Sequence, residues 1–200
     1  MQPLPWPLPG AFVAWGLSNG QFTPESLAAM AVSRGFRWLA LEEDDYRNDA
    51  RIPEFVVASR ARGLLAGVWQ TQPTTKVWSG IDFYIAEPER PIDTVDFARR
   101  HRVFNPTLRS AFITNLDTHG NPDYFKPLVD AGFAGITEAY VSDNPQATPE
   151  AMAFQARQVG IPDSQPCISL YEGRNGHPSV ADYGDLSAWP GWSVYLAEHL

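Results

Sequence analysis

The chain has 200 residues, of which 44% are hydrophobic, enough apolar side chains for one ordinary globular domain. Its net charge is −8 at pH 7 and it contains no basic run, which argues against nucleic acids and anionic membranes as partners, because phosphate groups are bound by clustered Lys or Arg. No segment reaches the roughly 20 continuous apolar residues of a transmembrane helix.

The chain begins with MQPLPWPLPG, which has four prolines but neither a basic start nor an apolar helical stretch. A signal peptide needs both, so we expect synthesis in the cytoplasm without export by the ordinary route. We predict an extended proline-rich arm over residues 1–10 and a single domain over residues 11–200.

Short apolar runs follow one another along this domain, and most end on a carboxylate or an amide. There are eight: residues 11–17, 37–44, 64–70, 81–87, 110–117, 132–140, 167–172 and 192–198. Most are separated by an amphipathic helical stretch, and this alternation of strand and helix is typical of parallel βα units. About eight such units in succession predict a closed (β/α)8 TIM barrel, compact and with short loops because this architecture usually takes about 250 residues.

Helix starts are marked by two similar tripeptides, Thr23-Pro24-Glu25 and Thr148-Pro149-Glu150. Each combines a capping hydroxyl, a proline at the first helical position and an acid near the positive end of the helix. Further helices are predicted over residues 53–62, 93–102 and 123–131, with a weaker one over 179–189.

Two units are irregular. Residues 71–80 contain Pro73 and lack an apolar helical stripe, so we predict a degenerate third helix there. A hairpin between the third and fourth strands is the alternative, and it would exclude the barrel. The chain also ends soon after the last run, which predicts no eighth helix and an uncovered flank beside the last strand.

The carboxyl ends of all strands of such a barrel meet at one face, which carries the active site in barrel enzymes. Side chains alternate along a strand, so Asn115 and Asp117 should point into this mouth while Phe112, Thr114 and Leu116 face the helices. An acidic rim is therefore expected from Glu42, Glu43, Asp44, Glu87, Asp117, Glu138, Glu172 and Glu198. As ligand-contacting residues we predict Glu42, Asp44, Asn115, Asp117, Glu138, Trp15, Trp69, Gln70 and Tyr140.

Two tripeptides resemble the large (β/α)8 clan of retaining glycoside hydrolases. Ala86-Glu87-Pro88 is similar to the clan's Asn-Glu-Pro motif at the fourth strand, and Tyr171-Glu172-Gly173 resembles its nucleophile turn at the seventh. The resemblance implies that Glu87 is the acid/base and Glu172 the nucleophile, which a retaining mechanism places about 5–5.5 Å apart. The clan's Asn, which holds the sugar 2-hydroxyl, is replaced here by Ala86.

Tryptophans support a glycan ligand, because a flat amphipathic ring stacks on a sugar face. Those at strand ends or in adjoining loops are Trp15, Trp69, Trp78, Trp189 and Trp192. Trp38 has apolar neighbours on both sides and is predicted to lie in the core, as is Cys167, the single cysteine.

The Ala/Arg/Trp/Pro-rich composition, the Ala-Arg-Gly helix ends and the RWLALEEDD strand also resemble small barrels in tail modules of actinobacterial phages. This resemblance implies a virion-associated protein that touches host cell-wall glycans. Other tail proteins would bind through the arm over residues 1–10 or the uncovered flank. A catalytically inactive structural or receptor-binding barrel is the alternative.

A metal-dependent barrel isomerase or phosphodiesterase is a second alternative. Asp117 and His119 form an acid-x-His pair, and Glu43, Asp45 and Glu138 would converge on the same mouth as oxygen ligands for Mg²⁺ or Mn²⁺. None of the four histidines shows HxH or HExxH spacing, so our main prediction contains no metal.

The sequence contains no motif typical of the other common classes of enzyme site. The chain has no Gly-x-Ser-x-Gly elbow, Walker loop or dinucleotide fingerprint, so we predict no cofactor. Lys76 and Lys126 lie outside the strand runs, which argues against a Schiff-base aldolase.

Overall fold

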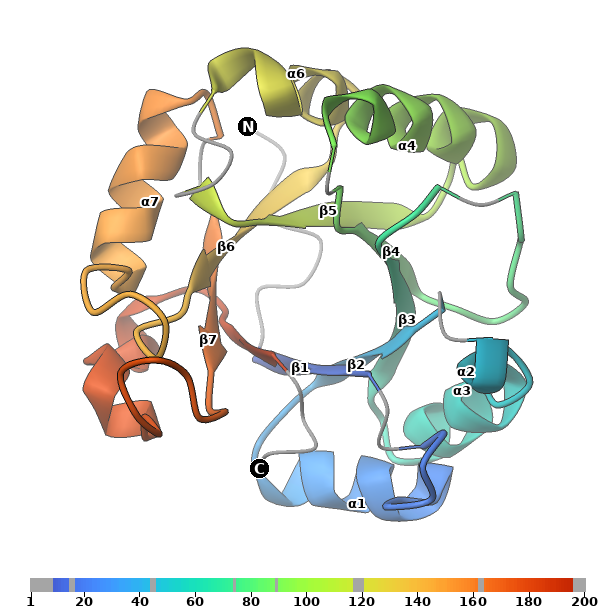
Figure 1. Cartoon of the computed structure of the whole chain (residues 1–200). Coiled ribbons are helices and arrows are strands. Elements are labelled where there is room, and N and C mark those ends of the chain that lie inside the picture. Colours follow the sequence, from blue (N-terminus) through green and yellow to red (C-terminus); the bar gives the residue numbers. More distant parts are fainter. Residues whose placement is uncertain are drawn as a thin grey trace.

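Eight parallel strands close into a barrel in chain order, from β1 to β8 and back to β1 (Figure 1). The strands are β1 Gly10–Val13, β2 Trp38–Glu42, β3 Leu65–Gln70, β4 Phe83–Ala86, β5 Arg109–Thr114, β6 Ala134–Ala139, β7 Gln165–Ser169 and β8 Ser193–Tyr195. This computed structural model describes residues 9–14, 17–43, 46–73, 75–88, 90–116, 121–161 and 164–195. The predicted (β/α)8 barrel is confirmed; most of the predicted arm and the residues after Tyr195 lie outside the description.

Helices surround the barrel on its outer side (Figure 1). They are α1 Pro24–Ser33, α2 Tyr46–Asp49, α3 Ile52–Ala61, α4 Pro91–Phe104, α6 Pro122–Asp130 and α7 Pro149–Gln158. Both predicted caps are confirmed: the hydroxyl of Thr23 accepts from the backbone N–H of Ser26 at 3.2 Å, and that of Thr148 from Ala151 at 3.3 Å. Within the described residues, no helix is long and apolar enough to cross a membrane.

The connection between β3 and β4 contains no helix among its described residues, yet the two strands are parallel, with Gln70 opposite Ala86. The hairpin alternative is therefore wrong. Polar contacts tie the connection down: Lys76 pairs with Asp49, and Asp82 pairs with Arg60 while accepting from the backbone N–H of Ala66 at 2.9 Å. These contacts take over the anchoring that a packed helix provides in the other units.

The weaker helix predicted over residues 179–189 is replaced by two 3-10 helices, η1 Val180–Tyr183 and η2 Leu186–Ala188. Gly184 lies between them with φ 74°, a left-handed conformation that ends the first turn. The Tyr183 side chain anchors this segment to the barrel, because its hydroxyl bonds to the backbone carbonyl of Ser169 at the end of β7.

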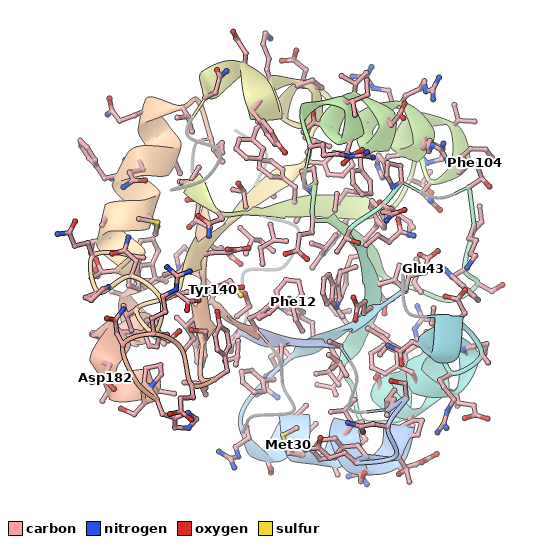
Figure 2. All side chains as sticks on the ribbon, in the orientation of Figure 1. Phe12, Met30, Glu43, Phe104, Tyr140 and Asp182 are labelled. Atoms are coloured by element: carbon pink, nitrogen blue, oxygen red, sulfur yellow. The ribbon has the colours of Figure 1, made fainter. Side chains whose placement is uncertain are left out.

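The barrel interior holds its own hydrophobic cluster, separate from the layer between strands and helices. Its buried members are Phe12, Ala14, Trp38, Ala40, Trp69, Phe83, Ile85, Ala111, Ile113, Ile136, Tyr140 and Cys167. Phe12 lies in the middle of the ring of strands (Figure 2). Glycines make room for the large rings, since a Cβ on Gly10 would lie 1.9 Å from Trp38 and one on Gly67 2.2 Å from Phe83. Trp38 and Cys167 are core residues, as predicted.

Candidate active site

Four predicted residues continue the inward-facing rows of the strands at the mouth of the barrel. Each stands two residues after a buried member of the interior cluster, on the same face of its strand. They are Glu42 after Ala40, Glu87 after Ile85, Asn115 after Ile113 and Glu138 after Ile136. All four are half-buried, so they are within reach of a solute that enters the mouth. On the other face of β5, Phe112 and Leu116 pack in the outer layer, as predicted.

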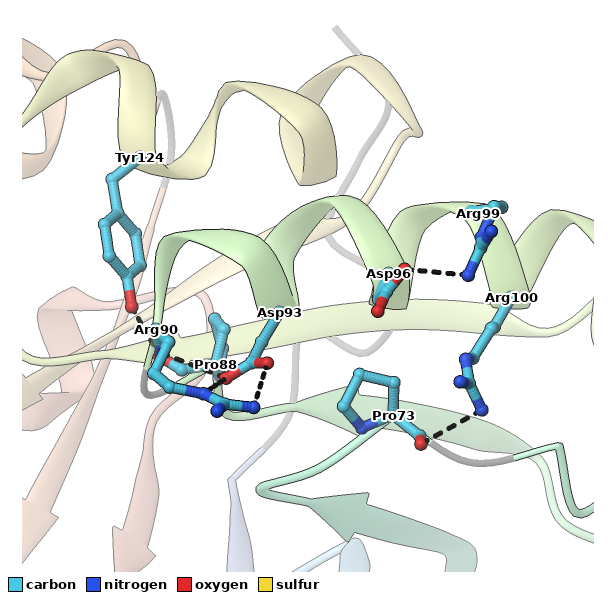
Figure 3. Close-up of polar contacts among 8 residues, drawn as sticks. All are labelled: Pro73, Pro88, Arg90, Asp93, Asp96, Arg99, Arg100 and Tyr124. Atoms are coloured by element: carbon cyan, nitrogen blue, oxygen red, sulfur yellow. Dashed lines mark hydrogen bonds and ion pairs between the residues drawn. The ribbon is translucent and has the colours of Figure 1, made fainter.

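The backbone on both sides of Glu87 is held firmly. Its N–H donates to the carbonyl of Gln70 at 2.7 Å and so extends the ladder between β3 and β4. The carbonyl of the next residue, Pro88, accepts from the hydroxyl of Tyr124 on α6 at 3.2 Å (Figure 3). These two bonds fix the backbone from which the Glu87 side chain extends. The Oε2 atom of this side chain is buried.

Glu138 is the carboxyl group with the most perturbed proton affinity. Burial raises its pKa from the ordinary 4.5 to about 7; a hydrogen bond with Asn115 opposes this shift and the charge of Asp143 adds to it. On β7 its ladder neighbour is Cys167, which lies inside the barrel. Glu138 therefore keeps its proton up to a higher pH than an ordinary glutamate does.

Aromatic rings pack against one another at the mouth, around Tyr195 and Tyr140. The ring centroids of Tyr140 and Tyr195 lie 5.5 Å apart, those of Trp69 and Tyr195 5.9 Å, and those of Tyr140 and Tyr171 6.0 Å. Burial raises the pKa of the Tyr195 phenol far above its usual range. The charges of Glu87, Glu138 and Glu42 raise it further. The charges of three carboxyl groups thus act on one phenol that stays protonated and can donate a hydrogen bond.

Glu172 lies in the loop after β7 and is exposed to solvent, whereas Glu42, Glu87 and Glu138 are half-buried. The preceding Tyr171 packs on the interior cluster and donates its hydroxyl to Asp143. The following Gly173 sits against the loop after β6, where a Cβ would come within 2.5 Å of the Ser142 carbonyl. The predicted pairing of Glu87 with Glu172 stays a prediction.

Two predicted ligand contacts do not fit their positions. Trp69 is 1% exposed and its indole N–H donates to the carbonyl of Val13 at 3.2 Å, so it forms the floor under the mouth. Gln70, the next residue, faces the outer layer, where its amide donates to the buried Glu43. The cavity beside this pair measures about 10 Å³, room for about one water molecule.

Several predicted residues lie outside the described part of the chain: Trp15, Asp44, Asp45, Asp117, His119 and Glu198. Among the residues that the structure does describe, no group of three or more His, Cys, Asp or Glu is arranged to hold a metal ion. The metal-dependent alternative rests on Asp45, Asp117 and His119, which are not described, so it stays a prediction.

Tyr195 and Tyr171 were not predicted from the sequence. Tyr195 follows Ser193 on the inward face of β8, so the alternation of the last apolar run would have identified it. Tyr171 follows the end of β7, where strand alternation stops being a guide. Among the described inward positions at the mouth there is no Lys, Arg or His.

No protein-family model matches the sequence, and no curated protein matches it. Solved structures share its fold. A tryptophan synthase from M. tuberculosis in its open form superposes with a TM-score of 0.56 at 16% identity, over 95% of this chain and 83% of that one. A native KDPGal structure gives a TM-score of 0.55 at 14% identity, over 96% and 83%. At such identities the likeness supports the barrel fold, which these neighbours use as enzymes, and nothing finer.

Proposed function

We propose that this chain is a carbohydrate-active barrel of the glycoside-hydrolase kind, with its acid–base site at the mouth. One observation supports this above the others. Glu138, whose pKa burial raises to about 7, shares the mouth with Glu87 and Glu42, whose charges act on the same Tyr195 hydroxyl. Hydrolysis of a glycosidic bond needs one carboxyl that still holds its proton and one carboxylate nearby.

In the proposed reaction Glu138 donates its proton to the leaving glycosidic oxygen. Glu87 attacks the anomeric carbon as the bond to that oxygen breaks, which forms a glycosyl ester. Water then attacks the anomeric carbon and passes a proton to Glu138, and the carboxylate of Glu87 leaves. The family resemblance implied that Glu87 is the acid; the raised pKa favours Glu138 in that role instead.

The mouth suits a neutral, hydroxyl-rich ligand. The phenol of Tyr195 is only half-buried and keeps its proton because burial raises its pKa, so it can donate to a sugar oxygen, while the phenol of Tyr171 already donates to Asp143. The described inward positions hold no cation to bind a phosphate or carboxylate substrate. By the resemblance to phage tail modules, the glycan belongs to a host cell wall and the partners are virion tail proteins.

The test is release of reducing sugar from cell-wall and storage polysaccharides by the wild type and by Glu138→Gln, Glu87→Gln and Glu172→Gln. Glu150→Gln, at an exposed glutamate on the outer helix α7, is the matched control. We expect the first two substitutions to abolish release. Loss of release in Glu172→Gln with full release in Glu138→Gln would restore the pairing predicted from the sequence.

Chemical rescue separates the two roles. Added azide should restore turnover to Glu87→Ala by replacing the nucleophile, with inversion at the anomeric carbon. Glu138→Ala should still cleave aryl glycosides whose leaving group needs no proton. If neither variant is rescued as described, the assignment of roles is wrong even where the wild type is active.

A non-catalytic receptor-binding barrel is the second candidate. It is favoured by Ala86, which is fully buried and lacks the amide that holds the sugar 2-hydroxyl in the resembling clan. Binding of a glycan in calorimetry, without release of sugar by the folded wild type, would support this candidate and remove the first.

A further inference from the structure

The outer face of α4 exposes more large apolar side chains than any other described element. Ile92 is 58% exposed, Val95 48% and Val103 67%, and Phe104 is exposed at the end of the helix (Figure 2). Single exposed apolar residues are ordinary on protein surfaces. Ile92, Val95 and Val103 share one face of the helix, with Arg99 between the two valines, and apolar exposure of this kind marks an interaction site.

This patch borders a groove. Helices α4 and α6 lie side by side on the barrel (Figure 1), and the space between them measures about 590 Å³. Its apolar lining comes from Val95, Ala98, Val103 and Pro127. The groove lies on the flank of the barrel, where it is separate from the carboxyl cluster at the mouth.

Charged side chains frame the groove in a balanced way. Arg99 and Arg102 stand on α4, while Asp123 and Asp130 stand on α6. Lys126 pairs with Asp130 at 2.7 Å, and Asp96 pairs with Arg99 at 2.8 Å (Figure 3). Three cations and three anions therefore cancel here, although the whole chain has a net charge of −8. A second copy of this chain, which also carries a net charge of −8, would therefore meet little net charge at this groove.

We propose that two copies of this chain pair through the α4–α6 groove, around a two-fold axis that places α4 of each copy over α6 of the other. Such an interface is self-complementary, since each contact occurs twice. Arg99 and Arg102 of one copy then face Asp123 and Asp130 of the second, while Val95 and Val103 fill the groove. Both mouths remain open, so the proposal does not depend on the proposed function.

The first test is sedimentation velocity of the wild type and of Val95→Asp/Val103→Asp over a concentration series. The matched control is Val57→Asp/Val180→Asp, which adds the same charge at two exposed valines on α3 and η1. We expect a dimer for the wild type and control, and a dissociation constant at least about tenfold higher for the groove variant. A wild type that is monomeric at every soluble concentration, or a groove variant as dimeric as the control, overturns the proposal.

Charge reversal tests the arrangement itself. Arg99→Glu/Arg102→Glu puts acids on α4 against the acids of α6, and Asp123→Lys/Asp130→Lys puts bases against bases, so each variant alone should be monomeric. Mixing them should restore a heterodimer, because both symmetric contacts then join opposite charges. Circular dichroism of each variant checks the fold. Failure of the folded variants to associate on mixing rules out the α4-over-α6 pairing.

Discussion

Glu42 and Glu43 are neighbours in the chain, yet they belong to two different regions of the molecule. Glu42 faces inward and is half-buried at the mouth, where its charge acts on Tyr195 together with those of Glu87 and Glu138. Glu43 faces outward and is 4% exposed, and its carboxylate accepts from the amide of Gln70 beside a cavity of about 10 Å³.

Successive residues of a strand point to opposite faces, so a shift of one position decides whether a glutamate lies at the proposed site or in the outer packing layer. A buried acid that bonds an amide is satisfied and stabilises the packing around it. An acid held among other acids and phenols, within reach of solvent, has its proton affinity set by its neighbours. The proposed site therefore includes the second kind of glutamate and excludes the first.

Paired Glu→Gln substitutions test this contrast most strongly. Glu138→Gln should lower kcat/KM for glycan hydrolysis by about 10²–10⁴-fold, because an amide cannot donate the proton that the leaving oxygen needs. Glu43→Gln keeps a hydrogen-bonding partner for Gln70 and should leave kcat/KM within about threefold of the wild type. Steady-state kinetics with thermal denaturation curves decides, and equal losses in the two variants would erase the contrast.

The pH dependence of stability tests the raised pKa of Glu138 directly. The folded protein holds this proton up to a pKa of about 7, whereas an ordinary glutamate loses it near 4.5. The contribution of Glu138 to the free energy of unfolding should therefore be fully present below about pH 4.5 and should be lost, by at most roughly 3 kcal/mol, as the pH rises through 7. Urea denaturation at about pH 5 and about pH 8 should show this fall in the wild type and a much smaller one in Glu138→Gln.

Alanine substitution on the two faces of β2 gives a smaller contrast. Glu43→Ala leaves the Gln70 amide buried without its acceptor and should lower the free energy of unfolding by about 2 kcal/mol. Glu42→Ala removes a half-exposed carboxylate from an acidic cluster and should change it by less than about 0.5 kcal/mol. Equal destabilisation in urea titrations would mean that both glutamates serve packing.

The fold was predictable because its signals are local. Thr23 and Thr148 cap helices through contacts with residues only three positions away, and the apolar runs show the strands directly. Asn115 and Glu138 were predicted at the mouth because strand alternation extends reliably by one step beyond a buried residue. The hairpin alternative arose because the contacts that anchor residues 71–82 come from α2, α3 and β3, which local pattern does not reveal.

The positions of three other predicted site residues depend on contacts that the local sequence does not show. Trp69 points into the barrel, as the alternation along β3 requires. How far it lies below the mouth depends on the tilt and stagger of all eight strands, which a single strand sequence does not show. Gln70 is the next residue along β3 and therefore points to the outer face of the barrel. The position of Glu172 depends on how the loops after β6 and β7 pack at Gly173, a contact between segments far apart in sequence.

Cys167 provides a built-in probe of this architecture. It is the single cysteine of the chain, it is fully buried inside the ring of strands, and burial raises the pKa of its thiol. A thiol reagent can reach it only when the packing around it opens, so the rate of labelling reports how often the barrel interior becomes accessible. Every variant described above can therefore be compared for opening of the barrel without adding a label or a new cysteine.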